Sequence, residues 1–229
     1  MKQPSQDDHV EAIRDMWRIF AIGENSVVEL RALWPLGIKP SQSTKSKLFH
    51  ASKYSNLNLF RDAVELEALR LNAIGYNVYT SLNPIKDGFS EGSVHDADIR
   101  YRDLLLIDID RTGPKKQPAN ANELEAARLL AAEVRSYCSK LDFPDPITVM
   151  SGNGYHLYYV LAKLENNDSN KMLVQGILQG LAAEFDNGVV SIDTSVYNAG
   201  RITKVPGTLM RKGEATEDRP YRMAVICND

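Results

Sequence analysis

The chain of 229 residues has few cysteines, no long apolar run and no net excess of positive charge. Cys138 and Cys227 lie far apart and form no Cys-x-x-Cys pair, which excludes a disulfide framework and a thiolate zinc site and predicts buried, reduced thiols. No apolar run approaches the roughly 20 residues that cross a bilayer. Residues 1–10 lack the apolar stretch of a signal peptide. With only ten prolines and 14 glycines, fibrous and disordered classes are also excluded, and a soluble cytoplasmic protein is expected.

The net charge of −3 arises from 27 basic and 30 acidic side chains, and this total alone argues mildly against a polyanionic partner. The charges are unevenly distributed, however, because no acidic residue occurs between Glu29 and Asp62 or within residues 194–213. Either these stretches are solvated loops or they form two anion-facing surfaces. Their basic residues are Arg31, Lys39, Lys45, Lys47, Lys53 and Arg61 in the first stretch, and Arg201, Lys204, Arg211 and Lys212 in the second.

Hydrophobic periodicity predicts a mixture of helices and strands. Helices are predicted over residues 7–22, 59–74, 121–141 and 171–185, and strands over 26–33, 76–80, 104–109, 147–150, 156–161, 189–192 and 221–227. Asn58 is expected to cap the second of these helices, and Asn120 with Glu123 is expected to form a capping box for the third. Residues 34–54 and 83–98 are predicted loops. This mixture indicates a mixed α/β or α+β fold in one domain over residues 1–229, with an N-terminal lobe of about 1–100 and a second lobe of about 101–229.

Two carboxylates follow an apolar run at residues 104–107. Strand alternation points Asp108 and Asp110 to the same side. Two carboxylates aimed together repel unless a cation lies between them, and such oxygen ligands suit Mg²⁺ or Mn²⁺. The alternative is a strand that ends at solvent with Asp110 in a turn, but Asp108 would then need another buried partner.

A second feature is the small-residue turn Ser-Gly-Asn-Gly at residues 151–154, which lies between two predicted strands and precedes His156. Its two glycines let backbone N–H groups converge on an anion, and Ser151, Asn153 and His156 add donors if they project the same way. The turn lacks the P-loop pattern. The segment is therefore either a phosphate cradle or an ordinary hairpin with a partly buried histidine.

A third feature is Asp193, which ends another apolar strand and is followed by Arg201 and Lys204. Asp193 could complete a three-carboxylate metal site, and the two cations would offset the charge of a bound triphosphate. Taken alone, Asp193 is more often a turn residue at a strand end.

Together and in this order, the three features resemble the motifs of the archaeo-eukaryotic primase superfamily, especially the primase-polymerase branch of phages, plasmids and other mobile elements. That branch has an apolar Asp-x-Asp motif, a histidine motif and a later apolar-Asp motif, which match Asp108 and Asp110, His156, and Asp193. Residues 79–84 and 201–208 also look like that branch. The resemblance covers roughly residues 27–208.

One position departs from the pattern, because the usual serine two positions before the histidine is Gly154 here. The Ser-Gly-Asn-Gly-x-His form instead resembles the polymerase domains of bacterial end-joining ligases, which makes Ser151 the expected phosphate donor. The chain also lacks the zinc-binding cysteines of cellular primases.

The resemblance implies template-directed primer synthesis and extension on single-stranded DNA, with NTPs or dNTPs as substrates. Asp108, Asp110 and Asp193 would hold two divalent ions, Mg²⁺ or Mn²⁺, at the primer 3′-hydroxyl and the triphosphate. The implied fold has two lobes, with an RNA-recognition-like sheet in the catalytic lobe. The implied triphosphate ligands are Ser151, Asn153, His156, Arg201 and Lys204, and the candidate template contacts are Lys45, Lys47 and Lys53, with Tyr54 for base stacking.

Two other functions remain open on sequence alone. The segment 105–112 also resembles the first motif of haloacid-dehalogenase-type phosphatases, although the final acidic pair of such enzymes has no counterpart except Glu217 and Asp218 in a polar stretch. The other is a non-catalytic nucleic-acid-binding module of the same fold. The abrupt end at Asp229 suggests a catalytic fragment of a longer protein, with a helicase or primer-binding region as the expected addition.

Overall fold

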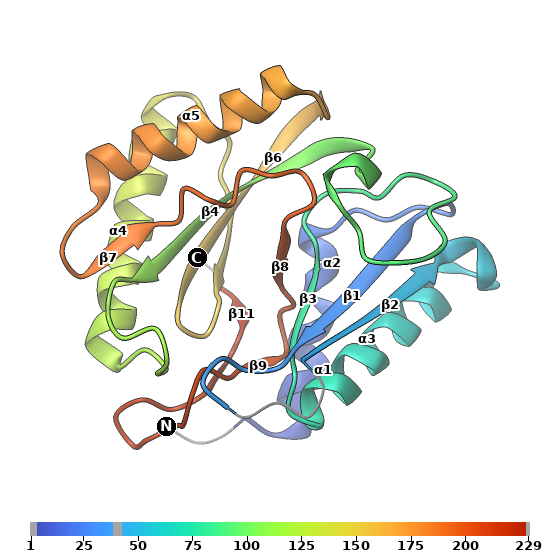
Figure 1. Cartoon of the computed structure of the whole chain (residues 1–229), viewed down its shortest axis with the longest axis horizontal. Coiled ribbons are helices and arrows are strands. Elements are labelled where there is room, and N and C mark those ends of the chain that lie inside the picture. The colour runs from blue at the N-terminus through green and yellow to red at the C-terminus, as the bar shows by residue number, and fades with distance from the viewer. Residues whose placement is uncertain (1–3, 39–42, 228–229) are drawn as a thin grey trace.

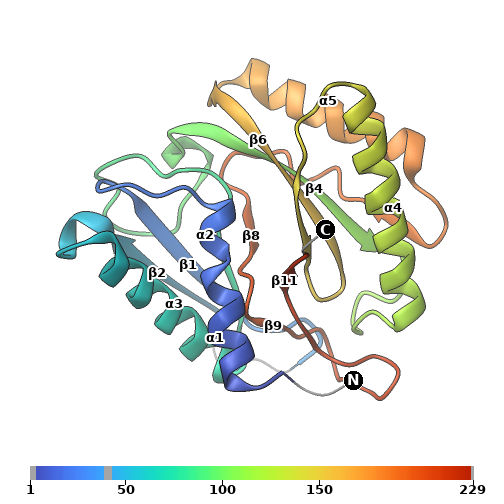
Figure 2. The ribbon, with the colours of Figure 1, turned by 180° about the vertical axis from the view of Figure 1, so that it is seen from behind.

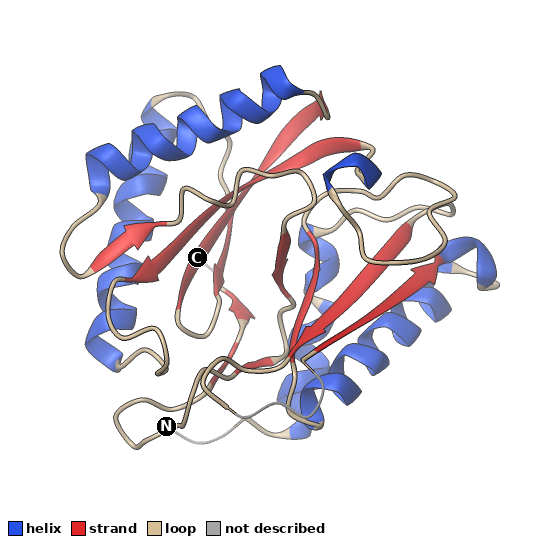
Figure 3. Cartoon of the chain, viewed as in Figure 1, coloured by secondary structure: helices blue, strands red, loops and turns tan. Residues whose placement is uncertain are grey.

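Two antiparallel sheets form the framework of the computed structural model, which describes residues 4–38 and 43–227 (Figure 1). The first sheet has the strand order β2-β1-β3-β8, and the second has the order β11-β5-β6-β4-β7. The open edge of the first sheet, β8, lies opposite the inner face of the second sheet (Figure 1). Helices cover the outer side of each sheet, as the colouring by secondary structure makes clear (Figure 3).

The first sheet packs its apolar face against α1 and α3, which lie behind it in Figure 1 and in front of it in Figure 2. Leu30 and Phe60 are fully or nearly fully buried in this interface. The elements of this part are α1 (Gln6–Arg14), α2 (Met16–Ile19), β1 (Val27–Leu33), β2 (Thr44–His50), η1 (Ala51–Lys53), α3 (Leu57–Ala73), β3 (Asn77–Ser81), η2 (Asp96–Asp98) and β8 (Ile202–Lys204).

The second sheet packs its outer face against α4 and α5, and Ile107, Ile109 and Leu157 are buried there. In chain order β4-α4-β5-β6-α5-β7, with the strand order β5-β6-β4-β7, it has the split βαββαβ arrangement of ferredoxin-like and RNA-recognition folds. The elements are β4 (Tyr101–Arg111), α4 (Ala121–Lys140), β5 (Ile147–Met150), β6 (Gly154–Glu165), α5 (Asp168–Phe185), β7 (Val190–Ile192), β9 (Leu209–Met210), β10 (Arg222–Met223) and β11 (Val225–Ile226), with β9 and β10 pairing outside the sheet.

The mixed α/β class and most element positions predicted from the sequence are confirmed. The capping box at Asn120 and Glu123 is present, with Asn120 Oδ1 accepting from the Glu123 N–H at 2.8 Å. The cap of α3 is Asn56 rather than Asn58, because the helix begins two residues earlier than predicted. The predicted first helix is divided at Asp15 into α1 and α2.

Both predicted loops were partly wrong. Residues 44–50 form the edge strand β2, paired with β1 along its whole length. The segment 83–98 contains η2, and it is also less exposed than expected, because Ile85 and Val94 are buried in a small apolar cluster with Ile99. Short strands β8 and β9 were missed. Each has only two or three residues, so no alternation pattern is long enough to indicate them.

The strand β8 joins the two halves of the chain. After the polypeptide has formed β4 to β7 of the second sheet, it returns to pair with β3 of the first, where Thr80 is opposite Thr203. Residues on both sides of position 100 therefore build the first sheet, and the division into lobes at about residue 100 stays a prediction. Within the described residues, no helix has the length and apolar character needed to cross a bilayer.

Candidate active site

The two carboxylates of the Asp-x-Asp motif lie on the inner face of the second sheet. In β4, alternation sends Leu105, Ile107 and Ile109 toward α4 and α5 and sends Asp108 and Asp110 the opposite way. Their side chains are 24% and 43% exposed, respectively. The predicted placement of both acids on one side of the strand is thus observed.

His156 lies directly across from Asp108 on the neighbouring strand β6. Its Nε2 atom is 3.3 Å from Asp108 Oδ1. Its other nitrogen, Nδ1, is 3.0 Å from the Tyr158 hydroxyl, which is 2.5 Å from Thr203 Oγ1 on β8. A chain of four polar side chains therefore runs from the carboxylate to the edge of the first sheet and fixes the orientation of the imidazole ring.

The charge balance differs between the two carboxylates. Burial tends to raise the pKa of Asp108. The nearby His156, and with it Arg201 and Lys212, opposes this effect and holds that pKa below its ordinary value. Burial and the neighbouring Asp108 raise the pKa of Asp110, because Lys212 Nζ at 3.9 Å from Oδ2 compensates only in part. The pair thus holds more negative charge than the surrounding side chains neutralise.

We expect Asp110→Asn to stabilise the metal-free protein at neutral pH. A raised pKa means that the folded state holds its proton more tightly than the unfolded state does. Stability is therefore lost as the pH rises from the ordinary aspartate pKa through the raised one. Thermal unfolding in EDTA measures the effect, and the advantage of the variant should disappear at a pH below both pKa values. A variant less stable than the wild type at pH 7–8 would contradict this charge balance.

We expect Tyr158→Phe to lower the free energy of unfolding by about 1–3 kcal/mol, because the buried His156 and Thr203 groups lose their shared partner. Urea titration measures this. The neighbouring Tyr159→Phe is the matched control. That buried hydroxyl lies beside the Cys138 thiol, which is a weak hydrogen-bonding group, so its loss should cost less. Equal losses in the two variants would show that the chain from Asp108 to Thr203 has no special contribution.

Asp193 lies at the end of β7, next to β4. Its backbone N–H donates to the Asp108 carbonyl at 2.8 Å, so the fold brings the third motif to the first. Its side chain, however, accepts from the Ser195 N–H at 2.8 Å, in a turn. Within residues 4–38 and 43–227, no three His, Cys, Asp or Glu side chains are grouped closely enough to hold one metal ion.

The chemistry of the Asp108 and Asp110 pair nevertheless fits a divalent cation. Both donors are carboxylate oxygens on one face of one strand, and burial together with repulsion from Asp108 raises the pKa of Asp110, a cost that a cation would relieve. Hard oxygen donors of this kind suit Mg²⁺ or Mn²⁺. Asp193 is the nearest motif residue that could add a third carboxylate.

The turn at residues 151–154 is closely packed. Gly152 has a φ of +105°, and a Cβ there would lie 2.5 Å from Met210 Cβ. At Gly154, a Cβ would overlap the Ile109 carbonyl oxygen and lie 2.8 Å from Asp110 Oδ1. This crowding explains the departure from the family pattern, because a serine at position 154 has no space beside β4.

Ser151 and Asn153, the predicted phosphate donors of this turn, are both buried. The Ser151 N–H donates to the Gly154 carbonyl and closes the turn. Asn153 Oδ1 accepts from the Ala119 N–H at 2.8 Å, so this side chain holds the loop after β4. Its Nδ2 atom is buried and has no hydrogen-bond partner among the described residues. Their predicted contact with a nucleotide is not tested by these observations.

Arg201 lies just before β8, and Lys204 is the last residue of this strand. Arg201 Nη2 donates to the Ser195 carbonyl at 2.5 Å and influences Asp108 electrostatically. Lys204 is buried, and its ammonium donates to Thr208 Oγ1 at 2.6 Å and to the Leu209 carbonyl at 3.1 Å. Burial, with Arg211 nearby, lowers the pKa of Lys204 well below its ordinary value. In this state Lys204 holds the 208–209 turn.

The first acid-free stretch does not form one continuous basic surface. Arg31 is paired with the buried Glu29 at 2.8 Å. Lys45 and Lys47 point to the opposite face of the sheet, where Lys45 lies over the Tyr76 ring and Lys47 is 3.5 Å from Glu67 of α3. Lys39 lies outside the described residues.

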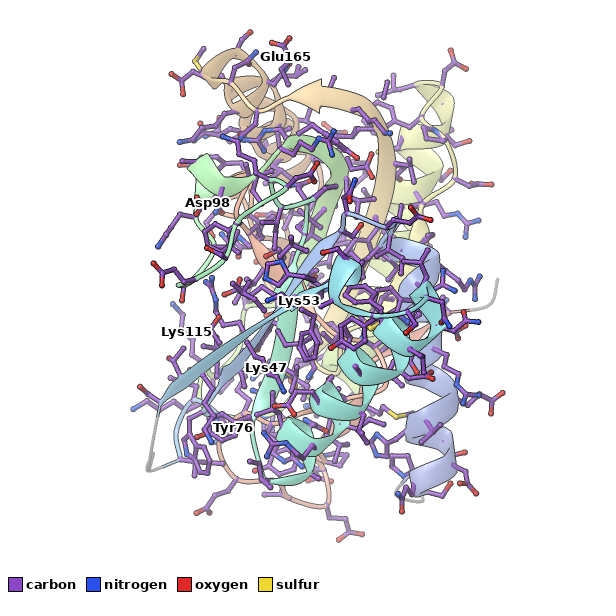
Figure 4. All side chains as sticks on the ribbon, turned by 90° about the vertical axis from the view of Figure 1, so that its right-hand side faces the viewer. Lys47, Lys53, Tyr76, Asp98, Lys115 and Glu165 are labelled. Carbon is purple, nitrogen blue, oxygen red and sulfur yellow. The ribbon has the colours of Figure 1, made fainter. Side chains whose placement is uncertain are left out.

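The remaining candidates of this stretch, Lys53 and Tyr54, lie just before α3. Lys53 is exposed in η1, and Tyr54 packs edge-to-face on Phe60 with 5.6 Å between ring centroids. Figure 4 shows Lys47 and Lys53 beside α3. A contact of these residues and Tyr54 with nucleic acid stays a prediction.

Sequence reasoning missed three side chains of this site. Tyr158 could have been found, because it follows His156 by two positions on one strand and therefore faces the same side. Lys212 was recognised only as part of a basic stretch. Tyr79, whose pKa is raised by burial and by Asp108 and Asp110, comes from the first sheet, and no local pattern places it near them.

No family model matches the sequence, and no curated protein matches it either. Solved structures do match. The primase-polymerase domain of cyanophage S-2L is similar with a TM-score of 0.52 and 17% identity, over 95% of this chain and 89% of that one. The polymerase domain of Mycobacterium tuberculosis Ligase D, solved in complex with DNA, is similar with a TM-score of 0.53 and 15% identity, over 95% of this chain and 79% of that one.

These likenesses extend over nearly the whole chain, and they agree with the antiparallel βαββαβ sheet that carries Asp108, Asp110 and His156. At such low identity they establish the arrangement of the backbone. The chain therefore has the archaeo-eukaryotic primase fold, in the form found in primase-polymerase domains.

Proposed function

We propose that this protein is a template-directed nucleotidyltransferase, which synthesises or extends primers from NTPs or dNTPs on single-stranded DNA. The observation that carries the proposal is the pair Asp108 and Asp110, half-buried on one face of β4. His156 contacts the Asp108 carboxylate, and the backbone N–H of Asp193 donates to the Asp108 carbonyl. The fold shared with a phage primase-polymerase and a ligase polymerase domain supports it.

The acidic residues would bind divalent cations. Asp108 and Asp110, with Asp193 once its side chain is released from Ser195, would supply carboxylate oxygens to Mg²⁺ or Mn²⁺. Bound ions of this kind neutralise the charge of the triphosphate and activate the attacking hydroxyl. The raised pKa of Asp110 supports this role, because a cation would compensate both the burial of this carboxylate and its repulsion by Asp108.

The polar residues around the pair would orient the triphosphate. His156 is held by Tyr158 with its Nε2 atom toward Asp108, and it would act as a hydrogen-bond donor rather than as a general base. Arg201 and Lys212 act electrostatically on Asp108 and would offset phosphate charge. Ser151 and Asn153 would donate from the turn. Lys204 would contribute only if it exchanged its present bonds to the 208–209 turn.

A phosphatase of haloacid-dehalogenase type is less consistent with the geometry. Its final acidic pair would have to be Glu217 and Asp218, which are exposed in a loop rather than at a strand end. Asp108 also lies within an antiparallel strand between β6 and β7, not at the beginning of the chain. Hydrolysis of a phosphomonoester without template or primer would establish that function instead.

Calorimetric titration separates an enzyme from a non-catalytic module of the same fold. Nucleoside triphosphate is titrated into the protein with Mg²⁺, with Mn²⁺ and with EDTA. The proposal requires binding that depends on the metal and is lost in Asp108→Asn. Binding of single-stranded DNA together with no metal-dependent nucleotide binding would favour the module.

A further inference from the structure

The loop at residues 111–120, which follows the Asp-x-Asp motif, is held by three side chains from two other parts of the chain. Arg222 Nη1 donates to the Ala119 carbonyl at 2.6 Å, and Arg219 Nη1 donates to the Pro118 carbonyl at 2.7 Å. Asn153 accepts from the Ala119 N–H at 2.8 Å. Loops normally satisfy their backbone groups with water, so this loop is unusually well fixed for a surface segment.

The loop is also held from inside. Arg111, whose side chain is 1% exposed, donates through Nη2 to the carbonyls of Pro114 and Gln117. Glu123 lies 3.5 Å from Arg111 and 2.7 Å from Arg219, so it pairs with two of the three arginines that hold the loop. These three arginines are engaged with loop carbonyls or with Glu123, and they therefore contribute rigidity.

Lys115 and Lys116 are exposed at the tip of the loop. No acidic residue occurs from 111 to 122, and within the described residues neither lysine forms an ion pair. Figure 4 shows Lys115 on the side of the molecule opposite α1. Two unneutralised cations thus project from a rigid loop beside the site.

The neighbouring loop brings more positive charge to the same place. Gly213 is so close to the Lys116 carbonyl that a Cβ at 213 would overlap it. Just before Gly213, Lys212 is 3.9 Å from Asp110. Further along this loop, Glu217 lines a groove with Asp8, Glu11 and Asp15. Lys212 therefore adds a positive charge between Asp110 and the backbone of the 111–120 loop at Lys116.

We propose that Lys115 and Lys116 form a binding site for the sugar-phosphate backbone of a nucleic acid strand, presented by the clamped 111–120 loop next to the catalytic carboxylates. A preorganised loop loses little entropy when its lysines contact phosphates, which favours binding. This inference rests on the proposed function, and it assigns the strand to a surface different from the one that the sequence pattern suggested.

The test measures binding of a fluorescent single-stranded oligonucleotide at several salt concentrations. Lys115→Gln with Lys116→Gln should weaken binding about tenfold and reduce the slope of log K against log salt by about 1.4, as expected for two lost phosphate contacts on a single strand. The matched control, Lys140→Gln with Lys171→Gln, removes the same charge from α4 and α5 and should bind as the wild type does.

The competing surface is tested in parallel with Lys47→Gln and Lys53→Gln. If this variant loses affinity and the Lys115/Lys116 variant does not, the inference is wrong. A wild-type protein that binds no oligonucleotide would overturn the inference and the proposed function together. Normal oligonucleotide binding with the predicted loss in the Lys115/Lys116 variant, but no nucleotide incorporation by the wild type, would overturn the proposed function alone.

Discussion

Asp108→Asn is expected to reduce metal-dependent nucleotide incorporation by at least about 10³-fold, while the protein remains folded. The substitution keeps the size of the side chain and an oxygen that can accept from His156 Nε2, now at 3.3 Å. It removes the charge that a divalent cation requires, and it relieves the repulsion that, after burial, raises the pKa of Asp110. Activity should therefore fall without a matching loss of stability.

Asp103→Asn is the control for this substitution. Asp103 lies on the same strand, but it lines a separate cavity near the other end of β4. We expect it to retain incorporation at nearly the wild-type rate. Primer extension measures both variants, with circular dichroism to verify folding. If Asp108→Asn retained more than a tenth of the wild-type rate with unchanged metal dependence, Asp108 could not be a metal ligand in the reaction.

Gly154→Ser is expected to destabilise the protein by at least about 3 kcal/mol, because the turn has no room for a Cβ. The new atom would overlap the Ile109 carbonyl oxygen and lie 2.8 Å from Asp110 Oδ1. Both strands would have to move at the point where the carboxylates are presented. A serine at this position, although common in the family that the sequence resembles, should therefore reduce stability and displace Asp110.

Gly180→Ala is the matched control for the glycine change. Gly180 lies in the exposed face of α5, where a Cβ would meet nothing within 4 Å. Alanine should stabilise that helix by roughly 0.5–1 kcal/mol. Urea unfolding of both variants gives the comparison. Wild-type stability of Gly154→Ser would show that β4 and β6 can separate at the turn, and the packing explanation would fail.

The local part of the site could be predicted from the sequence because it depends on strand alternation. An apolar run followed by Asp108 and Asp110 defines one inward face, and the two glycines beside Asn153 define a turn. The same reasoning would have included Tyr158, which shares a face with His156. The fold class followed from the mixture of helical and strand periods.

The rest depends on contacts between distant segments. The pairing of Thr203 with Tyr158 joins residues separated by 45 positions, and the bond from Asn153 to Ala119 joins residues separated by 34. The basic stretch containing Lys45 and Lys47 was predicted as a loop, but it pairs with β1 and turns these lysines toward α3. Charge composition cannot reveal which side of a sheet a lysine occupies.

Primer extension by the wild-type protein tests the central claim most directly. A labelled primer on a single-stranded DNA template, and a template without primer, are incubated with Mg²⁺ or Mn²⁺ and with NTPs or dNTPs supplied separately. The account predicts metal-dependent, template-directed incorporation that EDTA abolishes. No incorporation under any of these conditions, by protein that binds the template, would contradict it.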